Sequence, residues 1–471
     1  MNGFPRSLFA GARFAIVGLG RNGLPAARAL TGMGAEVIAW DDQPAAREAA
    51  AQEGFTVREP TMAGLDALIL SPGIPHRLPR PHRLAQTAAE AGVPILSDAD
   101  LLYQAVRRAG SGARFAGITG TNGKSTTTAL LAHILTTAGI PNAAGGNLGP
   151  AALALPLLHQ DGVYVLEMSS YMLERLAALR FDAAAMLNLS ADHIDRHGDM
   201  RGYARAKRAI FDRQRAEDTA IIGIDDADSR ALAATLGRPV IRISGEQPAD
   251  VSGGQPADVY CADGILRDRT GKLLAMAEAR ALPGAHNAQN AAAAAALATA
   301  LGVKREAIAA GIASFPGLAH RQQLVAATGG IRFINDSKAT NADAAARALA
   351  CHDRLIWIAG GVAKEGGIAS LAAYFPRIAH TLLIGRDAPL LAETLAAHGA
   401  PFTIVETLEC AVPAALAAAR QGGADVVLLS PACASFDQFS GFEARGDRFA
   451  ALAAALAPNA APQAALTREA P

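Results

Sequence analysis

The feature that most constrains this chain is a series of short apolar runs, each closed by a Gly-rich or polar loop and followed by an Ala- and Leu-rich stretch. Continuous apolar strands that alternate with helices are typical of parallel sheets covered on both faces. The pattern therefore predicts an α/β fold with mostly parallel sheets. Ligands of such sheets bind at the carboxyl ends of the strands, so the residues that close each run are candidates for chemistry. The runs are RFAIVGLG (13–20), AEVIAWDD (35–42), DALILSPG (66–73), RFAGITG (114–120), VYVLEMS (163–169), AAAMLNLS (183–190), RLIWIAGG (354–361), HTLLIGR (380–386) and ADVVLLSP (424–431).

Length and composition narrow the class of protein. The 471 residues suffice for about three domains, and 51% hydrophobic residues with 18% charged ones exclude global disorder. A formal net charge of zero argues against nucleic-acid binding but leaves a local anion site open. No apolar run is long enough to predict a membrane span. The four cysteines form no close pairs and no metal-type spacing, which indicates a reducing cytoplasm.

Two breaks divide the series of runs. The first break is the small, polar segment RRAGSGA at 107–113, and the second is at residues 315–317. Each break separates one strand–helix series from the next. They predict three domains, 1–110, 111–316 and 317–471. Segment 245–258 carries QPAD twice among Gly, Ser and Pro, which predicts a surface insertion, and the Ala/Pro-rich end of the chain is expected to fray.

The first motif is GLGRNG at 18–23, which follows one run and opens a helical stretch. Asp41 and Asp42 close the next run. Glycines at this spacing let the backbone approach a pyrophosphate at a helix N-terminus, and the acid can address a ribose or a base. The motif predicts nucleotide or diphosphate binding, with a purely structural tight turn as the alternative, and it does not identify the ligand as NAD.

The second motif is GITGTNGKSTT at 117–127, again between a run and a helical stretch. Gly120 and Gly123 allow successive N–H groups to surround a phosphate, Lys124 can reach the β- and γ-phosphates, and the Ser125 or Thr126 hydroxyl can bind Mg²⁺. The strict phosphate-loop pattern fails, because an isoleucine stands where its first glycine is expected. An accidental Gly-Lys-Ser is the alternative, but the strand–loop–helix context favours phosphate binding.

Further polar residues close the next runs. Glu167 and His193 follow neighbouring runs and are candidate Mg²⁺ ligands, whereas His197 is interpreted as part of a polar surface loop. Asn287 and Asn290 share one face at the start of an Ala-rich helix, where they can read an adenine edge. Capping of that helix by Asn287 is an equally good interpretation.

The last segment holds three polar clusters. His320-Arg321 precedes NDSKATN at 335–341, Lys364 lies in a Gly-rich loop, and SPACASFDQF begins at Ser430. Cys433 has no histidine near it in sequence, so we interpret it as a packing residue in place of a nucleophile.

Together these motifs resemble the Mur ligase family, in order and over nearly the whole chain. The resemblance implies an N-terminal Rossmann-like domain for a UDP substrate, a central P-loop-type ATPase and a C-terminal Rossmann-like domain for an amino acid. It implies a monomer that uses ATP to join D-glutamate to UDP-N-acetylmuramoyl-L-alanine through an acyl phosphate, in peptidoglycan precursor synthesis. The motifs that carry it are GxGxxG, SPG (71–73), GGN (145–147), a GxxGTNGKS phosphate loop, DHxDRHG, HNxxN, HR, NDSKATN and SPACASFDQF, of which the last two point to D-glutamate.

The resemblance also assigns residues. The nucleotide contacts are Gly117, Thr119, Gly120, Thr121, Asn122, Gly123, Lys124, Ser125, Thr126, Asn287, Asn290, Arg321 and Asp336. Two Mg²⁺ ions are expected at Ser125, Glu167, His193 and a carbamylated Lys207, which from the residues alone is an ordinary helix-face charge. The UDP substrate is assigned to Gly20, Arg21, Asn22, Asp41, Gly73 and Asn147, and the glutamate to Lys338, Thr340, Lys364, Ser435 and Phe442. The catalytic residues among them are Lys124, His193, Lys207 and Lys338.

One departure and three alternatives remain. The family commonly reads Ser-Ser-x-Gln after the metal-binding glutamate, whereas this chain has Met172 in place of the Gln, so a contact to the substrate's peptide end is missing or supplied otherwise. The alternatives are a sibling ligase for another amino acid, a nucleotide-dependent switch, and an NAD dehydrogenase that rests on GLGRNG alone.

Overall fold

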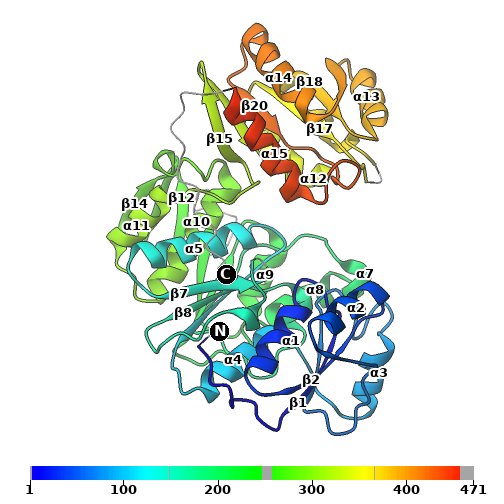
Figure 1. Cartoon of the computed structure of the whole chain (residues 1–471). Coiled ribbons are helices and arrows are strands. Elements are labelled where there is room, and N and C mark those ends of the chain that lie inside the picture. The colour runs from blue at the N-terminus through cyan, green and yellow to red at the C-terminus, as the bar shows by residue number, and fades with distance from the viewer. Residues whose placement is uncertain (1–2, 148, 247–256, 365, 457–471) are drawn as a thin grey trace. The chain divides into compact units, whose positions relative to one another are not determined.

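The computed structural model describes residues 3–147, 149–246, 257–364 and 366–456. Most of the repeated QPAD segment and the C-terminal end that was expected to fray therefore lie outside the described residues. The chain forms two compact units, Met1–Phe315 and Pro316–Pro471 (Figure 1). No helix in the described ranges is long and apolar enough to cross a membrane.

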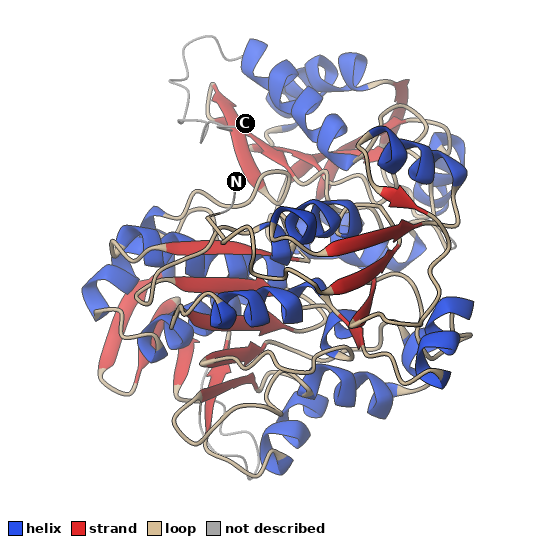
Figure 2. Cartoon of the chain, turned by 60° about the horizontal axis from the view of Figure 1, so that its bottom comes forward, coloured by secondary structure: helices blue, strands red, loops and turns tan. Residues whose placement is uncertain are grey.

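The first unit contains two sheets (Figures 1 and 2). The first has the order β3-β2-β1-β4-β5 and is parallel throughout. Its strands are β1 (Arg13–Val17), β2 (Glu36–Trp40), β3 (Thr56–Val57), β4 (Ala67–Leu70) and β5 (Ile95–Leu96). The second has the order β14-β13-β12-β11-β10-β9-β6-β8-β7. Its strands are β6 (Arg114–Thr119), β7 (Asn142–Gly146), β8 (Val163–Glu167), β9 (Ala183–Met186), β10 (Thr219–Gly223), β11 (Val240–Ser244), β12 (Val259–Ala262), β13 (Ile265–Asp268) and β14 (Gly271–Ala275).

Alternate residues of β1 show why its run is apolar throughout. Phe14 and Ile16 pack into one core, while Ala15 and Val17 pack into another on the opposite face. The core that holds Phe14 continues to Phe115 on β6, so the two sheets share it. The opposite face of the second sheet is covered by an Ala- and Leu-rich core of three helices, α5 (Lys124–Thr137), α10 (Ala285–Ala300) and α11 (Arg305–Ser314). Helices on both faces leave the carboxyl ends of the strands as the accessible edge.

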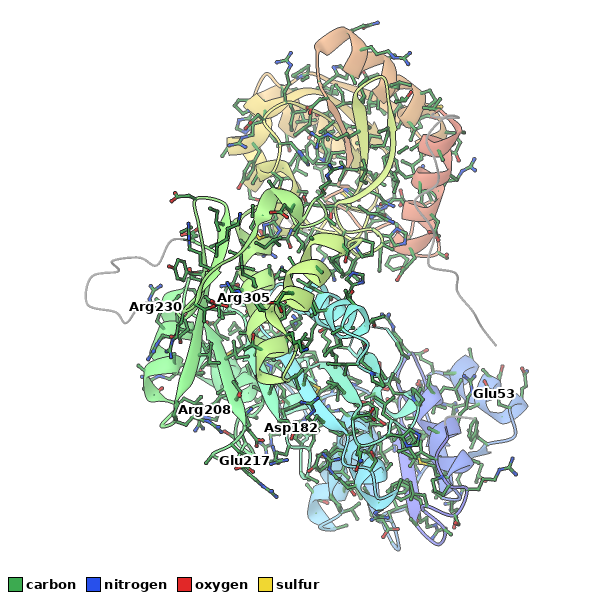
Figure 3. All side chains as sticks on the ribbon, turned by 90° about the vertical axis from the view of Figure 1, so that its left-hand side faces the viewer. Glu53, Asp182, Arg208, Glu217, Arg230 and Arg305 are labelled. Atoms are coloured by element: carbon green, nitrogen blue, oxygen red, sulfur yellow. The ribbon has the colours of Figure 1, made fainter. Side chains whose placement is uncertain are left out.

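The helices of the first unit connect these strands. They are α1 (Gly23–Gly32), α2 (Pro44–Gln52), α3 (Arg83–Glu90), α4 (Asp98–Arg108), α5 (Lys124–Thr137), α6 (Ser170–Leu173), α7 (Ile194–His197), α8 (Met200–Arg208), α9 (Ala227–Thr235), α10 (Ala285–Ala300) and α11 (Arg305–Ser314), with short 3₁₀ turns η1 (Ala152–Ala154) and η2 (Met276–Glu278). Charged side chains lie at the outside of this unit, for example Arg208 and Glu217 (Figure 3).

The second unit is a single sheet with the order β15-β16-β20-β17-β18-β19. One face carries a core of α12, α13 and η3, and the other carries a core of α14 and α15. The strands are β15 (Gln323–Thr328), β16 (Ile331–Asn335), β17 (Leu355–Gly360), β18 (Ile378–Ile384), β19 (Phe402–Glu406) and β20 (Val426–Leu429). The helices are α12 (Ala342–Ala350), η3 (Ala369–Arg377), α13 (Ala388–Ala397), α14 (Leu408–Gly422) and α15 (Phe442–Ala455).

The predicted fold class is confirmed at the level of an α/β protein with mostly parallel sheets. Every apolar run identified in the sequence contains a parallel strand. The edges differ from the prediction, because β12–β13–β14 and β15–β16 pair antiparallel. Those edge strands mix polar and apolar residues, so they lack the signal of a strand that is buried on both faces. The division of the chain into three domains at residues 110 and 316 stays a prediction.

Candidate functional site

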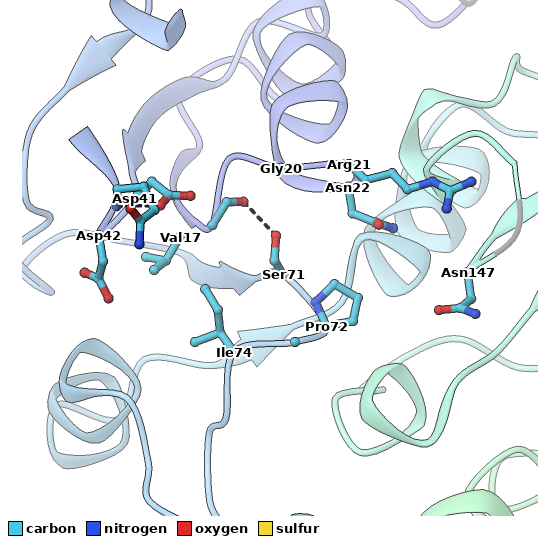
Figure 4. A pocket seen from close by; sticks show the side chains of 13 residues that line it. Val17, Gly20, Arg21, Asn22, Asp41, Asp42, Ser71, Pro72, Ile74 and Asn147 are labelled. Atoms are coloured by element: carbon cyan, nitrogen blue, oxygen red, sulfur yellow. Dashed lines mark hydrogen bonds between the residues drawn. The ribbon is translucent and has the colours of Figure 1, made fainter. Parts of the chain in front are cut away.

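A pocket in the first unit brings together all the residues assigned to the UDP substrate. It has a volume of about 480 Å³ and is lined by loops of the first sheet and by Asn147, which follows β7 of the second (Figure 4). Its walls therefore come from the carboxyl ends of strands in both sheets. The assigned residues among its lining are Gly20, Arg21, Asn22, Asp41, Gly73 and Asn147.

The glycines of this pocket fall into two kinds. A Cβ on Gly18 would lie 2.7 Å from the side chains of Ser71 and Ile74, so that glycine is required by the packing of the protein itself. Gly20 and Gly73 differ, since a Cβ on either would meet none of the described residues within 4 Å and neither backbone is left-handed. The protein's own packing does not require glycine at those two positions, which leaves space for a ligand.

Asp41 organises the Gly-rich turn. Its carboxylate accepts hydrogen bonds from the backbone N–H of Leu19 at 2.7 Å and of Gln43 at 2.8 Å. The acid that closes β2 thus fixes the turn after β1 through its backbone. Asp41 therefore has a bracing role beside the ligand contact that the sequence predicts for it.

The opposite wall of the pocket, 71–74, is held by a buried arginine that the sequence motifs did not single out. Arg175, 3% exposed, donates to the carbonyls of Leu70 at 2.8 Å and Ser71 at 3.2 Å, and also to the carbonyl of Ile74. Its Nε donates to Nδ1 of His76, and burial lowers the pKa of that imidazole to about 4. A guanidinium with several carbonyl acceptors fixes the loop in one geometry.

The phosphate-type loop joins β6 to α5. Gly123 has a left-handed backbone (φ +83°), and a Cβ there would lie 2.2 Å from Oδ1 of Asn290. The start of α10 therefore packs directly on the loop. Lys124 Nζ donates to the carbonyls of Gly120 and Thr121, both at 2.9 Å, so the ammonium folds over the loop, and Ser125 is buried at the first turn of α5. Gly117 lies within β6, where a Cβ would meet the Phe181 ring at 2.7 Å; packing alone accounts for that glycine.

Neutral amides hold this loop in place. Asn188, which follows β9, accepts from the Asn122 N–H at 2.9 Å and donates to the Asn122 carbonyl at 3.3 Å. It also donates to Gln289 Oε1 at 3.0 Å, and Gln289 in turn donates to Asp225 at 2.7 Å. Asn188 closes one of the apolar runs, so the strand-end rule could have identified it.

Asn287 and Asn290 lie side by side on α10, 7% and 2% exposed. Asn290 Nδ2 donates to Asn287 Oδ1 at 3.0 Å, and Asn290 Oδ1 accepts from the Thr127 hydroxyl at 3.3 Å. The alternative interpretation of Asn287 as the helix cap is wrong, because Gly284 precedes the helix and Asn287 lies within its first turn. Its Nδ2 donates back to the Pro283 carbonyl.

Lys207 is a buried amine beside the phosphate-type loop. Its side chain is 2% exposed, and Nζ donates to the Gly120 carbonyl at 2.8 Å and to the Thr119 hydroxyl at 3.5 Å. Nζ also lies 4.7 Å from the centre of the Tyr203 ring. Burial, and then the charge of Lys124, lower the pKa of Lys207 well below its ordinary value. The interpretation of Lys207 as an ordinary exposed helix charge is wrong, because this face of α8 turns inward.

Glu167 is the last residue of β8, and its two carboxylate oxygens differ in their hydrogen bonding. Oε1 accepts from Asn147 Nδ2 at 2.7 Å, whereas Oε2 is buried and has no hydrogen-bond partner within the described ranges. A buried carboxylate oxygen is costly unless it is paired, so this atom fits a cation. No cluster of three or more His, Cys, Asp or Glu side chains suited to a metal is found in the described part of the chain. A cation here would therefore need hydroxyl, carbamate or ligand oxygens as well.

The two histidines of the DHxDRH segment differ. His193 has a left-handed backbone (φ +53°) and a half-exposed ring, and burial together with the charges of Lys207 and Lys124 lowers its pKa. His197 is 8% exposed, between Glu174 at 3.0 Å and the Ser170 hydroxyl at 3.0 Å. The interpretation of His197 as part of a surface loop is therefore wrong. Met172, in place of the family's Gln, is 1% exposed in the core of the unit.

In the second unit, Asp336, which the sequence assigns to the nucleotide, directly follows β16 and is buried. Its carboxylate accepts from the Ser430 hydroxyl at 2.8 Å and from the Gln322 N–H at 3.2 Å. Burial raises the pKa of Asp336 to about 7, and the charge of Arg321 acts in the opposite direction. Asp336 is therefore held by the protein itself, as Asp41 is.

Two residues assigned to glutamate, Lys338 and Phe442, meet at the start of α15. Lys338 Nζ lies 3.7 Å from the centre of the Phe442 ring. A two-way backbone bridge between Val362 and Ala434, at 2.8 and 2.9 Å, joins the loop of Lys364 to the loop of Ser435. Ser435 is 2% exposed and Lys364 is exposed. Cys433 is 1% exposed and burial raises the pKa of its thiol to about 12, in agreement with a packing residue.

Comparisons with known proteins bear on these sites. A family model described as the Mur ligase middle domain matches residues 118–298, and one described as the Mur ligase, glutamate ligase domain matches 320–433. The UDP-N-acetylmuramoylalanine--D-glutamate ligase of Paramagnetospirillum magneticum is 49% identical over 94% of this chain and 96% of its own length. The ligases of the same name from Caulobacter vibrioides and Rhodospirillum rubrum are each 48% identical, over 93% and 96% of this chain and over 94% and 96% of their own lengths.

Solved structures share the fold. UDP-N-acetylmuramate-alanine ligase MurC from Thermotoga maritima matches 93% of this chain and 98% of its own, with a TM-score of 0.57 at 17% identity. MurF from Acinetobacter baumannii matches 78% of this chain and 81% of its own, with a TM-score of 0.52 at 21% identity. At these identities the likeness supports the fold and not a substrate.

Proposed function

This chain belongs to the Mur ligase family, and we propose that it is an ATP-dependent ligase that joins D-glutamate to UDP-N-acetylmuramoyl-L-alanine. The observation that carries the proposal is the 49% identity, over nearly the full length of both chains, to a ligase of that name. In this reaction a carboxylate takes the γ-phosphoryl group of ATP, and the amine of glutamate displaces phosphate from the acyl phosphate. The reaction belongs to cytoplasmic peptidoglycan precursor synthesis, and the chain acts as a monomer.

We propose three domains for this activity. Residues 1–110 form a Rossmann-like domain for the UDP moiety, 111–316 a P-loop-type ATPase, and 317–471 a Rossmann-like domain for glutamate. Support comes from the separate sheets, β1–β5 in the first of these segments, β6–β14 in the second and β15–β20 in the third.

ATP binds through the loop between β6 and α5. Lys124 neutralises the β- and γ-phosphates, while backbone N–H groups of the loop other than those of Thr121 and Asn122, which bond to Asn188, surround them. Asn287 and Asn290 serve the adenine side. Further nucleotide contacts come from Thr119, Ser125, Thr126, Arg321 and Asp336. Gly117 contributes indirectly, because it lies in β6 and so helps to position the loop that follows this strand.

Two Mg²⁺ ions are held by Ser125, Glu167, His193 and Lys207. The unpaired, buried Oε2 of Glu167 supports a cation at the end of β8. Mg²⁺ supplies charge neutralisation between the γ-phosphate and the substrate carboxylate, two anions that otherwise repel each other. Hard oxygen donors suit this ion, and His193 is the one nitrogen ligand in the set.

Lys207 contributes as a carbamate. Its amine attacks the carbon of CO₂, an N–C bond forms and one proton leaves to water, so an ammonium position becomes an anionic oxygen donor. The burial of the amine and its contacts with Gly120 and Thr119 support this step, because a neutral amine is the reactive form. Lys207→Ala is expected to lose activity and to regain part of it with acetate, while ¹³C-bicarbonate is expected to give a carbamate NMR signal in the wild type.

The UDP substrate occupies the pocket lined by Gly20, Arg21, Asn22, Asp41, Gly73 and Asn147. The open space beside Gly20 and Gly73 suits a diphosphate that approaches the backbone closely. The amino acid is bound by Lys338, Thr340, Lys364, Ser435 and Phe442, where the two ammonium groups pair with the carboxylates of glutamate.

A substrate panel tests the proposal. Phosphate release is measured with UDP-N-acetylmuramoyl-L-alanine and ATP plus D-glutamate, L-glutamate, L-alanine or meso-diaminopimelate. We expect turnover with D-glutamate. Preference for another amino acid would assign a sibling ligase, and hydrolysis of ATP that ignores both cosubstrates would assign a nucleotide-dependent switch.

A further inference from the structure

A buried arginine in the second unit is used by none of the assigned contacts. Arg445 lies in the first turn of α15, is 1% exposed, and bonds to a hydroxyl and to backbone carbonyls. No carboxylate within the described residues forms an ion pair with it. Burial lowers the pKa of its guanidinium to about 10, so the group stays charged at neutral pH. A buried charge of this kind is costly unless all its donors are used.

The acceptors of Arg445 come from three places in the sheet, the last residue of β17 and the loops that follow β16 and β20. Nε and Nη2 donate to the hydroxyl and the carbonyl of Ser337 at 2.9 and 2.8 Å. Nη1 donates to the carbonyls of Cys433 at 3.1 Å and Gly360 at 3.5 Å. The strands β16, β20 and β17 are neighbours in the sheet. One planar guanidinium thus ties together three strand ends.

Each of these strand ends leads to a residue assigned to glutamate. Ser337 directly precedes Lys338, Cys433 lies two residues before Ser435, and Gly360 opens the loop that leads to Lys364. The Ser337 hydroxyl also donates to the Phe442 carbonyl at 2.8 Å, which links the first loop to the start of α15.

We propose that Arg445 is the positioning residue of the glutamate pocket, which holds the loops after β16, β17 and β20 in the one arrangement that binds D-glutamate. This inference rests on the proposed function. A lysine reaches one or two of the carbonyls, but it has no planar fork that can serve three loops at once. Arg445 touches no substrate, so its effect is on binding of the amino acid through the loops.

The test compares Arg445→Met and Arg445→Lys with Arg448→Met. Arg448 lies on the same helix, is half-exposed and pairs with Glu409 at 2.7 Å, so it controls for loss of a helix arginine. We expect the KM for D-glutamate to rise about 10- to 100-fold in both Arg445 variants, by analogy with other lost buried hydrogen bonds to charged groups. The KM for UDP-N-acetylmuramoyl-L-alanine stays within about twofold. A third variant, Arg445→Ala, leaves room for a small guanidinium, and we expect added methylguanidinium to restore part of its affinity for glutamate.

A KM for D-glutamate that stays at the wild-type value, or equal rises in the KM of both cosubstrates, would overturn the inference. Because an Arg445 variant can fail to fold, Ser337→Ala provides a second measurement. It removes the hydroxyl that joins Arg445 to Phe442 and leaves the guanidinium in place, and we expect a selective rise of several-fold in the KM for D-glutamate. No rise there would equally contradict the proposal. Wild-type enzyme that does not use D-glutamate at all would instead reject the proposed function.

Discussion

Two loops of the first unit, 120–124 and 71–74, line proposed phosphate sites but are held in place by opposite kinds of side chain. The loop at 120–124 is braced by neutral amides, with Asn188 bonded to both backbone groups of Asn122. The loop at 71–74 is braced by the buried guanidinium of Arg175, which lies against His76.

The difference follows from what each loop carries. Lys124 already brings a positive charge to the first loop, and Lys207 brings a second amine within reach of the same carbonyl. A further buried cation there would repel both. The loop at 71–74 holds no lysine or arginine of its own, so a charged brace is tolerated and places positive potential behind the pocket. The comparison predicts distinct phenotypes for changes in the two regions.

The largest effect is expected from Lys124→Met. Loss of the ammonium that faces the β- and γ-phosphates lowers kcat about a thousandfold or more, because charge neutralisation dominates phosphoryl transfer. Binding of the UDP substrate, measured by calorimetry, stays within about twofold, since Lys124 lies outside that pocket. Lys304→Met, at an exposed lysine, is the matched control, and comparable losses in the two variants would refute the assignment of Lys124.

Asn188→Ala tests the neutral brace. Removal of its bonds to Asn122 and Gln289 is expected to raise the KM for ATP about tenfold, while the KM for the UDP substrate changes little. The control is Asn142→Ala, at the amino end of β7, where the amide bonds to Thr136 and Ile140, away from the phosphate-type loop. An ATP KM unchanged in Asn188→Ala would mean that the loop holds its shape without this brace.

The sequence could predict the parts that depend on local pattern. The apolar runs contain the parallel strands, and the polar residues that close them meet at the carboxyl ends, because parallel strands share that edge. The residues assigned to the UDP substrate, which span positions 20–147, line a single pocket for this reason.

The remaining features depend on burial, which a helix-face pattern does not reveal. Nothing in the local sequence pattern distinguishes Arg175, Lys207 and Arg445 from exposed charges, yet all are buried to 3% exposure or less. Gly117 matched a motif but is explained by the Phe181 ring, a contact across 64 residues that no local pattern encodes. The antiparallel strands at the edges of the sheets are not predicted by the apolar runs, because solvent-facing strands mix polar and apolar residues.

Gly20→Ala tests whether ligand space or internal packing sets the shape of the UDP pocket. The added methyl group has no neighbour within 4 Å among the described residues, so the melting temperature stays within a degree or two while the KM for the UDP substrate rises about fivefold. Gly32→Ala, also without contacts within 4 Å but outside the pocket, leaves both values near those of the wild type. An unchanged KM in Gly20→Ala would show that the substrate keeps clear of the turn.

The smallest effect concerns the charged brace, through the pH dependence of stability. Burial, aided by the charges of Arg175, Arg77 and Arg196, lowers the pKa of His76 from 6.5 to about 4, against the pull of Glu174. At a pH between these two pKa values, the imidazole of His76 is protonated in the unfolded chain and neutral in the folded chain. The free energy of unfolding therefore falls as pH drops from 6.5 towards 4, by about 1 kcal/mol or less because water screens this partly solvated imidazole, and this contribution is constant above 6.5.

His76→Gln removes this titration, so its stability curve loses that part of the acid slope while the wild type keeps it. Urea unfolding at several pH values measures both curves. The neutral brace predicts the complementary result, because Asn188→Ala removes no ionisable group and shifts stability by the same amount at every pH. The contradicting outcome is that the His76→Gln and wild-type curves run parallel between pH 4 and 6.5. The pKa of His76 would then be the same in the folded and the unfolded chain, and the proposed difference between the charged brace of loop 71–74 and the neutral brace of loop 120–124 would be wrong.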